Sequence, residues 1–444
     1  MSLKGKLTIV ALSTTIAFYA VVGGFLSVHK DVFAKGDPYV QMRIFGEVLR
    51  HIVRDYVDEP DLEKVKVGAL RGLAEGLDPY SAYLSPEQAK KFNSSHNDQA
   101  GTGMILSRVA GYIYVVAVVK DSPADKVGLR TGDFIEYIDT LPTRDISLYD
   151  ATELLTGQNG SEIDIKVFRR GRPYKAKIKR AIISQPAIES STPETGIGYL
   201  KVTSLVDGKA EEVKKQLVEL QKKGTQKLVL DLRGAANGSL ETGVEIVNLF
   251  VKSGTLAKSI GHKNVVEKTF EADASKAVFN GQLVVVIDRS TASAGEVIAA
   301  AILANKRGDL LGEKTFGAGS VQKLFELKGG AAMLITISKY ADPSGTAFIK
   351  ENPGIVPSIE VKNASAPTEE TLPEDNDQQN NNDQQAKVED PQLPIEPIAE
   401  DIQLKKAIEA LKGNQSEKHA AQVDDKKPTE NKTSNKSKAA GAGL

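Results

Sequence analysis

Two runs of apolar residues, KLVLDLRG and LVVVID, limit the fold of this chain more than any other feature of its sequence. Each run ends in a turn of small residues, and a helical segment follows: LETGVEIVNLFVKSG after the first and AGEVIAAAILANK after the second. A strand that is apolar at every position is buried on both faces, and helices that join such strands form the crossovers of a parallel sheet. With IGYLKV and GKAEEVKKQLVELQKKG before them, these segments predict a largely parallel α/β sheet with helices on both faces.

The composition excludes several kinds of site and partner. The 57 basic and 58 acidic side chains give a net charge of −1, so no global field attracts nucleic acid or anionic lipid. The chain has no cysteine, which rules out disulfides, thiol nucleophiles and thiolate metal sites, and its five histidines are scattered. We expect no metal, no cofactor and no nucleic-acid partner.

The N-terminal region contains a segment that is long enough to cross a membrane. Leu7 to Leu26 carry no charge over the roughly 20 residues that a spanning helix needs. Lys4 and Lys6 precede it and favour a cytoplasmic N-terminus. We favour an uncleaved anchor over a cleaved signal, because the best cleavage site, at residues 32–34, lies far downstream. The prediction is a single-pass protein of the inner, or cytoplasmic, membrane, held by residues 7–26, with the remainder facing the periplasm or the cell exterior.

Residues 101 to about 181 alternate strands with two short helices and contain the phrase SPADKVGLRTGDFI. This pattern resembles a PDZ domain, in which a glycine-rich loop offers backbone N–H groups to the terminal carboxylate of a bound peptide, which adds a strand beside a helix. The resemblance assigns substrate binding to a loop and to the groove face of the helix SLYDATELL. The loop residues are Gly101, Thr102, Gly103 and Met104, and the helix residues are Leu148, Ala151 and Leu155.

The strand end DRSTASAGEV places a serine, Ser293, directly before a helix that starts at Ala294. Sites in sheets of this kind lie where the strands end. The free N–H groups at a helix N-terminus and the positive end of its dipole can stabilise an oxyanion that develops beside the serine hydroxyl. A helix cap is the alternative role for the same serine, and the local pattern leaves both open.

Taken in order, the segments resemble the C-terminal processing proteases of peptidase family S41. The resemblance rests on DLRG..NG, STASAGEV, GEKTFG.GSVQ and DPSG...KENPGIVPSIEV, and covers residues 38 to 362. It implies a crotonase-like (ClpP-like) α/β serine protease core with an inserted PDZ domain. In the family's terms Ser293 is the nucleophile, the N–H of Ala294 is one oxyanion donor, Gly238 or its neighbour Asn237 is another, and Gln322 orients the catalytic pair.

The family's usual TFGKGSVQ reads TFGAGSVQ here, so the position of its general-base lysine falls on Ala318. A serine hydroxyl is a weak nucleophile until a base takes its proton, and a methyl group is no base. On a strand, Lys314 would lie about 13 Å from residue 318 and Lys323 would face the other way, at roughly 3.3 Å per residue. We interpret both as surface charges, and His262 has no recognisable acid partner.

A second departure is RGAANG in place of the usual RGNPGG. Asn237 tolerates a left-handed backbone better than most residues, so we expect the turn to persist.

The C-terminal part has a different composition. EDNDQQNNNDQQ and DDKKPTENKTSNKSKAAGAGL are polar and predict disorder. Between them EDIQLKKAIEALKG has apolar residues at helical spacing, and docking, dimerisation or a lone tethered helix all remain open. The predicted organisation is a membrane anchor or signal segment (1–35), an N-terminal helical unit (36–98), a PDZ domain (99–182), an S41 protease core (183–362), and a low-complexity tail (363–444) with a short helix near 400–412.

Two functions follow from the resemblance. The first is a membrane-anchored serine endopeptidase whose PDZ domain recruits unfolded or C-terminally tailed protein substrates. The second is a catalytically impaired or inactive pseudoprotease that binds substrate without turnover, because Ala318 supplies no base. An adaptor and a homo-oligomer are further partners that the sequence leaves open.

Overall fold

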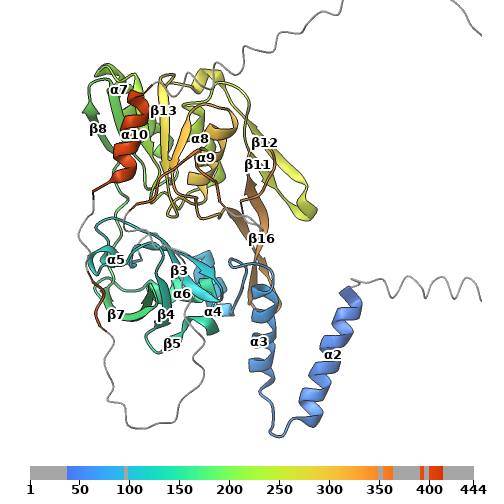
Figure 1. Cartoon of the computed structure of the whole chain (residues 1–444). Helices are drawn as coiled ribbons and strands as arrows, with labels where there is room; N and C mark the ends of the chain where they lie inside the picture. Colours follow the sequence, from blue (N-terminus) through green and yellow to red (C-terminus); the bar gives the residue numbers. More distant parts are fainter. Residues whose placement is uncertain (1–37, 95–98, 349–353, 364–390, 395–399, 414–444) are drawn as a thin grey trace, which may run out of the picture. The chain divides into compact units, whose positions relative to one another are not determined.

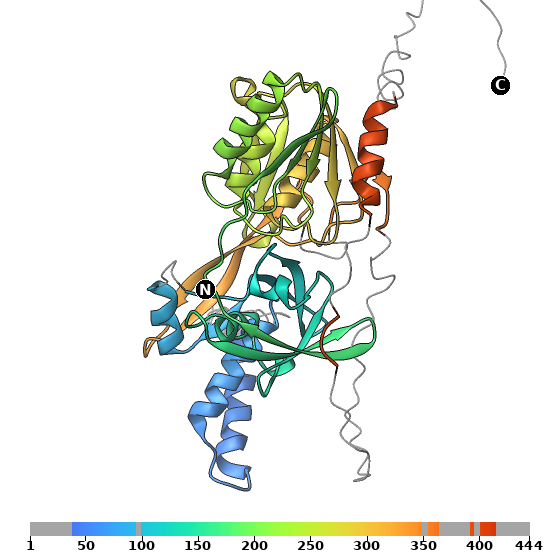
Figure 2. The ribbon, with the colours of Figure 1, turned by 90° about the vertical axis from the view of Figure 1, so that its left-hand side faces the viewer.

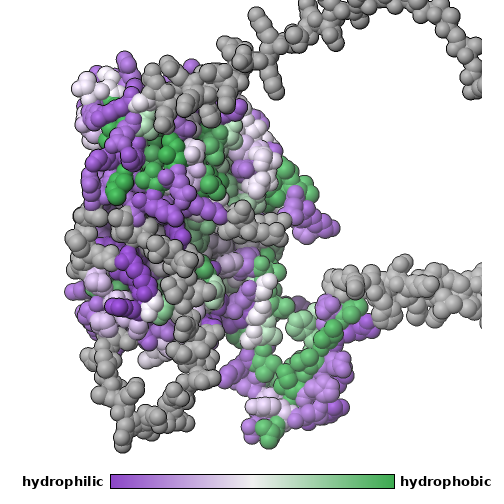
Figure 3. Space-filling model, in the orientation of Figure 1, coloured by the Kyte–Doolittle hydropathy of each residue, from purple (hydrophilic) through white to green (hydrophobic). Residues whose placement is uncertain are grey.

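The computed structural model describes residues 38–94, 99–348, 354–363, 391–394 and 400–413 (Figure 1). The chain forms two units, Met1–Leu70 and Arg71–Leu444. In the first unit, helix α2 (Pro38–Asp55) carries apolar side chains at helical spacing, and Met42, Phe45 and Leu49 are all exposed. Figure 3 shows these apolar side chains gathered along α2.

The prediction of a single-pass membrane protein is corrected by the structure. Among the described residues, no helix is long and apolar enough to cross a membrane. Helix α2 has 18 residues but includes Arg43, Glu47, Arg50 and Arg54, which a spanning helix would have to bury in lipid. The segment from Leu7 to Leu26 lies outside the described residues.

The larger unit contains the predicted parallel sheet. It has six strands in the order β17-β14-β13-β10-β9-β8. All neighbours are parallel except β8 and β9, which are antiparallel. The strands are β8 (Glu189–Glu194), β9 (Ile197–Lys201), β10 (Lys227–Asp231), β13 (Gln282–Ile287), β14 (Asp309–Gly312) and β17 (Ile359–Glu360).

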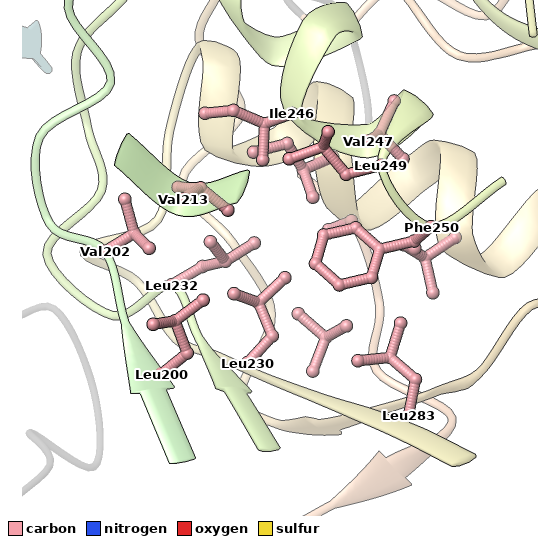
Figure 4. Close-up of a cluster of buried hydrophobic side chains, with 14 of the residues drawn as sticks. Leu200, Val202, Val213, Leu230, Leu232, Ile246, Val247, Leu249, Phe250 and Leu283 are labelled. Carbon is pink, nitrogen blue, oxygen red and sulfur yellow. The ribbon is translucent and has the colours of Figure 1, made fainter. Parts of the chain in front are cut away.

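Side chains at alternate positions of the central strands pack against helices on opposite faces of the sheet. Leu228, Leu230 and Leu283 belong to the cluster that includes the helices α7 (Lys209–Lys222), α8 (Leu240–Asn248) and α9 (Ala294–Ala304). Figure 4 shows Leu230, Leu283 and Phe250 within this cluster. Val229 and Val284 face the other way and pack with α10 (Ile402–Lys412), which lies on the opposite side of the sheet in Figure 2. Helices therefore cover both faces, which confirms the prediction.

An antiparallel sheet of five strands extends from this core. Its strands are β1 (Ala82–Leu84), β11 (Thr255–Ile260), β12 (Val266–Glu271), β15 (Ser320–Glu326) and β16 (Ala332–Ala341). Helix α3 (Leu62–Glu75) precedes it in the chain, and α4 (Pro86–Asn93) follows β1. Ser85 caps α4 in a reciprocal capping box with Gln88. The short helices of the core are η3 (His262–Asn264) and η4 (Ala274–Lys276).

The PDZ region forms its own sheet in the order β2-β3-β4-β6-β7, with β5 paired to β4. Its elements are β2 (Met104–Val109), β3 (Tyr112–Val118), α5 (Pro123–Lys126), β4 (Phe134–Ile138), β5 (Leu141–Pro142), η2 (Thr143–Asp145), α6 (Leu148–Leu155), β6 (Glu162–Arg169) and β7 (Arg172–Lys179). Strands β2 and β7 are the two edges of this sheet.

Apart from Asn363, only two parts of the predicted low-complexity tail belong to the described residues. They are residues 391–394 and the segment 400–413 that contains α10. The predicted disorder concerns residues 364–390 and 414–444, which lie outside the described part. Disorder therefore stays a prediction.

Candidate active site

Ser293 lies in the turn between strand β13 and helix α9, as the sequence predicts. It is the N-cap of α9 and has φ 53° and ψ −120°, a backbone conformation that non-glycine residues rarely adopt. A sharp strand–turn–helix junction of this kind exposes the serine hydroxyl at the end of the strand. The half-buried hydroxyl donates a hydrogen bond to the carbonyl oxygen of Gly238 at 3.1 Å. A carbonyl accepts that bond but cannot take up the proton.

The turns that follow strands β10 and β13 lie next to each other. Ser290, after β13, accepts a hydrogen bond from the N–H of Gly234, after β10, at 2.7 Å. The N–H of Ala292 donates to the carbonyl of Ala235 at 2.9 Å. These cross-links fix the loop that ends in Gly238 beside the turn that carries Ser293.

Gly238 has a backbone conformation that glycine adopts readily and other residues rarely do. Its φ is +95°, and a Cβ on this residue would lie 2.2 Å from the carbonyl oxygen of Leu205, so no other residue fits. The tolerance of Asn237 for a left-handed backbone is not needed in this turn, because the positive φ values fall on Gly234 and Gly238. Asn237 stabilises the loop with its side chain, which accepts from the N–H of Leu205 at 2.8 Å.

The N–H groups of Gly238 and Ala294 are the predicted oxyanion donors. Within the described part of the chain, neither donates a backbone hydrogen bond outside the regular elements. Ala294 is the first residue of α9, where N–H groups have no partner inside the helix. Both groups are thus available to a ligand, and their catalytic role stays a prediction.

Glu296 joins the Ser293 turn to the loop that carries Ala318. One carboxylate oxygen accepts from the hydroxyl of Thr315 at 2.5 Å and from the N–H of Gly317 at 2.8 Å. The other accepts from the N–H of Ala318 at 2.8 Å and from the N–H of Ser293 at 3.2 Å. Burial raises the pKa of Glu296 to about 7, against the opposing effect of these hydrogen bonds.

A cavity of about 130 Å³ lies beside Ser293. Ala318 lines it and is 9% exposed, so its methyl group stands next to the serine, where a longer side chain would enter the cavity. The lining residues are Tyr80, Ile105, Leu106, Val116, Ala236, Ala292, Ser293, Ala318, Gly319, Ser320 and Gln322. None of them carries a basic side chain.

The three candidate replacement bases lie elsewhere. Lys323 is exposed, with its ammonium group 5.6 Å from the ring centre of Phe325. His262 is exposed on the short helix η3. Lys314 precedes Thr315 in the loop and is absent from the lining of the cavity. Lys323 and His262 are thus exposed, whereas Lys314 is half-buried, so its interpretation as a surface charge stays a prediction.

Gln322 lines the same cavity, but the hydrogen bonds of its side-chain amide go to Ser320 and Thr336 and not to Ser293. Its amide nitrogen donates to the hydroxyls of Ser320 at 2.7 Å and Thr336 at 3.2 Å. Thr336 in turn donates to the carboxylate of Asp78 at 3.0 Å. The orienting role of Gln322 therefore stays a prediction.

The predicted peptide-binding loop of the PDZ domain has a fixed backbone. Gly103 has φ +85°, and a Cβ there would lie 2.2 Å from the Cβ of Ser122. Gly101 exchanges hydrogen bonds with Ala181 at 2.9 and 3.0 Å, and the buried Thr102 accepts from Ala124 at 2.9 Å. Met104 begins strand β2 and packs against the PDZ hydrophobic cluster.

The side chains on the predicted groove face of α6 pack largely against the hydrophobic cluster of the PDZ domain. Ala151 and Leu155 are buried in the PDZ cluster, and Leu148 packs against it. Leu148 also lines a second cavity, of about 380 Å³, together with Glu75 and Arg108. Ligand binding along this face stays a prediction.

Two features of the site were missed in the sequence. The first is Glu296, although Ser293 followed by Glu three residues later is the pattern of a capping box. The second is the contact of the PDZ domain with the catalytic loops. Tyr114 of β3 stacks on Phe316 with ring centres 5.5 Å apart, next to Ala318 in a shared cluster. No local sequence pattern predicts such a contact between domains.

Comparison with known proteins identifies two regions of the chain. The pattern of "Peptidase family S41" matches residues 196–361, and that of "PDZ domain" matches residues 114–169. The chain is 30% identical over 358 residues to the "Carboxy-terminal-processing protease" of Bartonella bacilliformis, covering 78% of this chain and 82% of that protein. It is 31% identical over 320 residues to the "Carboxy-terminal processing protease CtpA" of Bacillus subtilis, covering 71% and 68%.

A solved structure supports the fold. The photosystem II D1 C-terminal processing protease matches with a TM-score of 0.63 and 23% identity, covering 74% of this chain and 87% of the other. The two curated relatives span most of the chain at 30% identity or more. The chain therefore belongs to peptidase family S41, among the carboxy-terminal processing proteases, and is a serine-type peptidase with a PDZ domain.

Proposed function

We propose that Ser293 is the nucleophile of a C-terminal processing site that binds protein substrates but cleaves them slowly or not at all. The observation that carries this proposal is the methyl group of Ala318 beside Ser293, in a cavity without a basic side chain. The hydrogen bond from the Ser293 hydroxyl to the Gly238 carbonyl supports it, because the hydroxyl proton has no base to accept it. The crotonase-like character of the core is part of the same proposal.

The reaction would begin with attack of the Ser293 oxygen on a substrate carbonyl carbon. The oxygen must lose its proton as the new C–O bond forms, and a neighbouring base normally takes that proton. The carbonyl oxygen becomes an oxyanion, which the N–H groups of Gly238 and Ala294 would stabilise. The amide bond then breaks when its nitrogen receives the proton, which leaves an acyl-enzyme for water to hydrolyse.

Glu296 does not supply the missing base in this proposal. Its pKa of about 7 suits a proton acceptor, but both of its oxygens already accept two hydrogen bonds each. None of these bonds comes from the Ser293 hydroxyl. Glu296 is better described as a positioning residue, which holds the Ser293 turn against the Ala318 loop.

The substrates in this proposal are unfolded proteins or proteins with free C-terminal tails. Support comes from the glycine loop of the PDZ domain, where a peptide carboxylate would meet backbone N–H groups at Thr102 and Gly103. The names of the relatives, which describe carboxy-terminal processing, agree with such substrates. Because binding is intact but no base is present, the protein would hold the C-terminal tail of a substrate without cleaving it.

The test is cleavage of an unfolded protein with a C-terminal tail by the purified chain and by Ala318→Lys. We expect negligible cleavage by the unmodified chain and an increase of about 10²–10⁴-fold with the lysine, the usual contribution of a general base. Ala318→Met is the matched control, because its side chain has a similar length but no amine. It should fill the cavity without restoring cleavage.

Two results would contradict the proposal. Rapid cleavage by the unmodified chain that is lost in Ser293→Ala would require another base. Equal cleavage by Ala318→Lys and Ala318→Met would mean that an amine at this position is not what the site needs. Binding of the tailed substrate, measured separately by fluorescence anisotropy, distinguishes a failure of capture from a failure of chemistry.

A further inference from the structure

A short piece of the C-terminal tail, Pro391–Pro394, lies against the outer edge of the PDZ sheet. The carbonyl of Pro391 accepts from the N–H of Lys175 at 2.9 Å, and the N–H of Leu393 donates to the carbonyl of Lys175 at 3.3 Å. Gln392 and Lys175 form a parallel bridge. Figure 1 shows this segment beside strand β7. The tail therefore extends the PDZ sheet at the edge opposite to β2.

Leu393 anchors this contact. Its side chain is only 7% exposed and belongs to the PDZ hydrophobic cluster, which also contains Ile165, Ala176 and Ile178. Its neighbours Gln392 and Pro394 are exposed. The segment thus binds by one apolar side chain and two backbone hydrogen bonds, in the manner of a peptide that adds to a sheet edge.

The prolines suit this segment to such binding. Pro391 offers only its carbonyl, which is the group that Lys175 uses. Pro394 restricts Leu393 to extended backbone, so less conformational freedom is lost when Leu393 docks. A proline-rich strand also leaves few N–H groups for a further strand, which closes the edge of β7 to other chains.

The same tail is fastened to the protease core a few residues later. Asp401 accepts from the guanidinium of Arg233 at 2.8 and 2.7 Å, and Ala407 is fully buried against the sheet. The buried Gln403 accepts from the side chain of Asn363, the last described residue before the tail, at 3.0 Å. The described parts of the tail therefore contact the PDZ domain at Leu393 and the protease core at α10.

We propose that Pro391–Pro394 and α10 form a clasp that fastens the PDZ domain to the protease core and limits how readily strands β2 and β3 uncover Ser293. Nine positions separate Leu393 from Ile402, which is a reach of roughly 30 Å for an extended chain. Ile105, Leu106 and Val116 of β2 and β3 line the Ser293 cavity, and the clasp holds the opposite edge of the same sheet. A tilt that carries the Leu393 site more than about 30 Å from Ile402 would have to release the clasp. The part of this inference that concerns cleavage rests on the proposed function; the mechanical part does not.

The test measures the distance between the PDZ domain and the core by pulsed electron paramagnetic resonance. The chain has no cysteine, so spin labels at Thr140→Cys and Lys215→Cys, both at exposed positions, report on one distance. We expect one narrow distribution for the parent. Leu393→Asp should raise the longer-distance population by about tenfold or more, from the loss of one buried leucine. Gln392→Asp places the same charge on an exposed neighbour and should behave like the parent.

Amide hydrogen exchange provides a second measurement. The amide of Lys175 should exchange about tenfold faster in Leu393→Asp than in Gln392→Asp, because the Pro391 acceptor is released. If Leu393→Asp does not fold, as judged by circular dichroism, Leu393→Ala takes its place with the same expected direction. Unchanged distances together with unchanged exchange in the folded variant would overturn the proposal.

Two other outcomes have distinct meanings. A parent distribution that broadens on dilution would overturn the clasp within one chain, because it would assign the Leu393 site to a segment from a second copy. In the Ala318→Lys background, release of the clasp should increase cleavage. If that background shows no cleavage at all, the proposed function fails, whereas the distance measurement still decides the clasp.

Discussion

Ser293 is held in a conformation that a single residue could not maintain. A positive φ on a residue with a side chain costs about 1–3 kcal/mol, and such strain persists only where neighbours enforce it. Glu296 is the neighbour that does so, since it accepts the N–H of Ser293 and three donors of the Thr315–Ala318 loop. An acid in the first turn of α9 also interacts favourably with the helix dipole.

Replacement of Glu296 should make stability less dependent on pH. Burial raises the pKa of Glu296 from 4.5 to about 7, so the folded protein keeps a proton that the unfolded chain has already lost. Between these values the free energy of unfolding should fall as pH rises, by about 3 kcal/mol at ~1.4 kcal/mol per pKa unit, and then level off. Glu296→Gln removes this titration and also loses hydrogen-bond acceptors. Urea unfolding at pH 5 and pH 8 should therefore show a larger loss of stability for the variant at pH 5.

The control for this measurement is Glu211→Gln on the exposed side of α7. It should change the free energy of unfolding by no more than about 0.5 kcal/mol at either pH. An equal loss of stability at pH 5 and pH 8 in Glu296→Gln would show that Glu296 has an ordinary pKa in the folded protein.

A methyl group on Gly238 should damage the oxyanion loop more than one on Gly234. Both glycines have positive φ, 95° and 85°, so alanine costs about 1–2 kcal/mol of backbone energy at either position. Only at Gly238 would the new Cβ collide with backbone, at 2.2 Å from Leu205; at Gly234 the nearest atom lies 3.4 Å away. In the Ala318→Lys background, Gly238→Ala should lower kcat/KM at least about tenfold more than Gly234→Ala. Equal effects would mean that the loop can shift to accommodate the methyl group.

At the scale of elements, the regular part of the fold was predictable because its pattern is local. The apolar runs of β10 and β13 and the helices after them predicted a parallel sheet covered on both faces, and the structure has it. The docking of α10 was not predictable, because an amphipathic helix shows that it has an apolar face but not what covers that face. The docking of Leu393 was not predictable either, because a single leucine between prolines forms no periodic apolar pattern that would indicate a buried face.

The candidate site was predictable to a similar degree. The positions of Ser293, Ala294 and Gly238 followed from the strand ends and the family motifs, and the structure brings them together. The positive φ values fall on Gly234 and Gly238 and not on Asn237, and residue preferences alone do not show which positions of the loop take them. Glu296 had a recognisable capping pattern, but its bonds to the Thr315–Ala318 loop join residues that are distant in sequence.

Removal of one buried leucine should detach α10 from the sheet. Leu411 is 4% exposed and packs in the cluster between α10 and the sheet, and its carbonyl accepts from the ammonium of Lys227 at 2.7 Å. Leu411→Ala should lower the free energy of unfolding by about 2–5 kcal/mol, the usual cost of such a truncation. Lys405→Ala, on the exposed side of the same helix, should change it by no more than about 0.5 kcal/mol. Urea denaturation measures both, and equal midpoints would show that α10 adds nothing to the core.

At the scale of the whole molecule, a small hydrophobic contact links the PDZ domain to the loops that carry Ala292 and Ala318. Tyr114 and Phe134 of the PDZ sheet share a cluster with Phe316, Ala292 and Ala318. Tyr114 and Phe316 stack with an interplanar angle of 18°. A contact of this size couples the two parts without merging their cores, since each part has a separate cluster of buried residues. We therefore expect this contact to supply most of the coupling that makes the PDZ domain and the protease core unfold together.

Phe316→Ala should separate the unfolding of the PDZ domain from that of the core. Loss of a fully buried aromatic ring costs about 3–5 kcal/mol; Phe316 is partly buried, so the cost is smaller, but it falls on the contact that couples the two domains. Differential scanning calorimetry should show one transition for the unmodified chain and two for Phe316→Ala, because all-or-none unfolding needs coupled parts. Phe325→Ala removes an aromatic ring that is 41% exposed on β15 and should leave a single transition. A single transition in Phe316→Ala would mean that other contacts, the clasp at Leu393 among them, are enough to make the domains unfold as one.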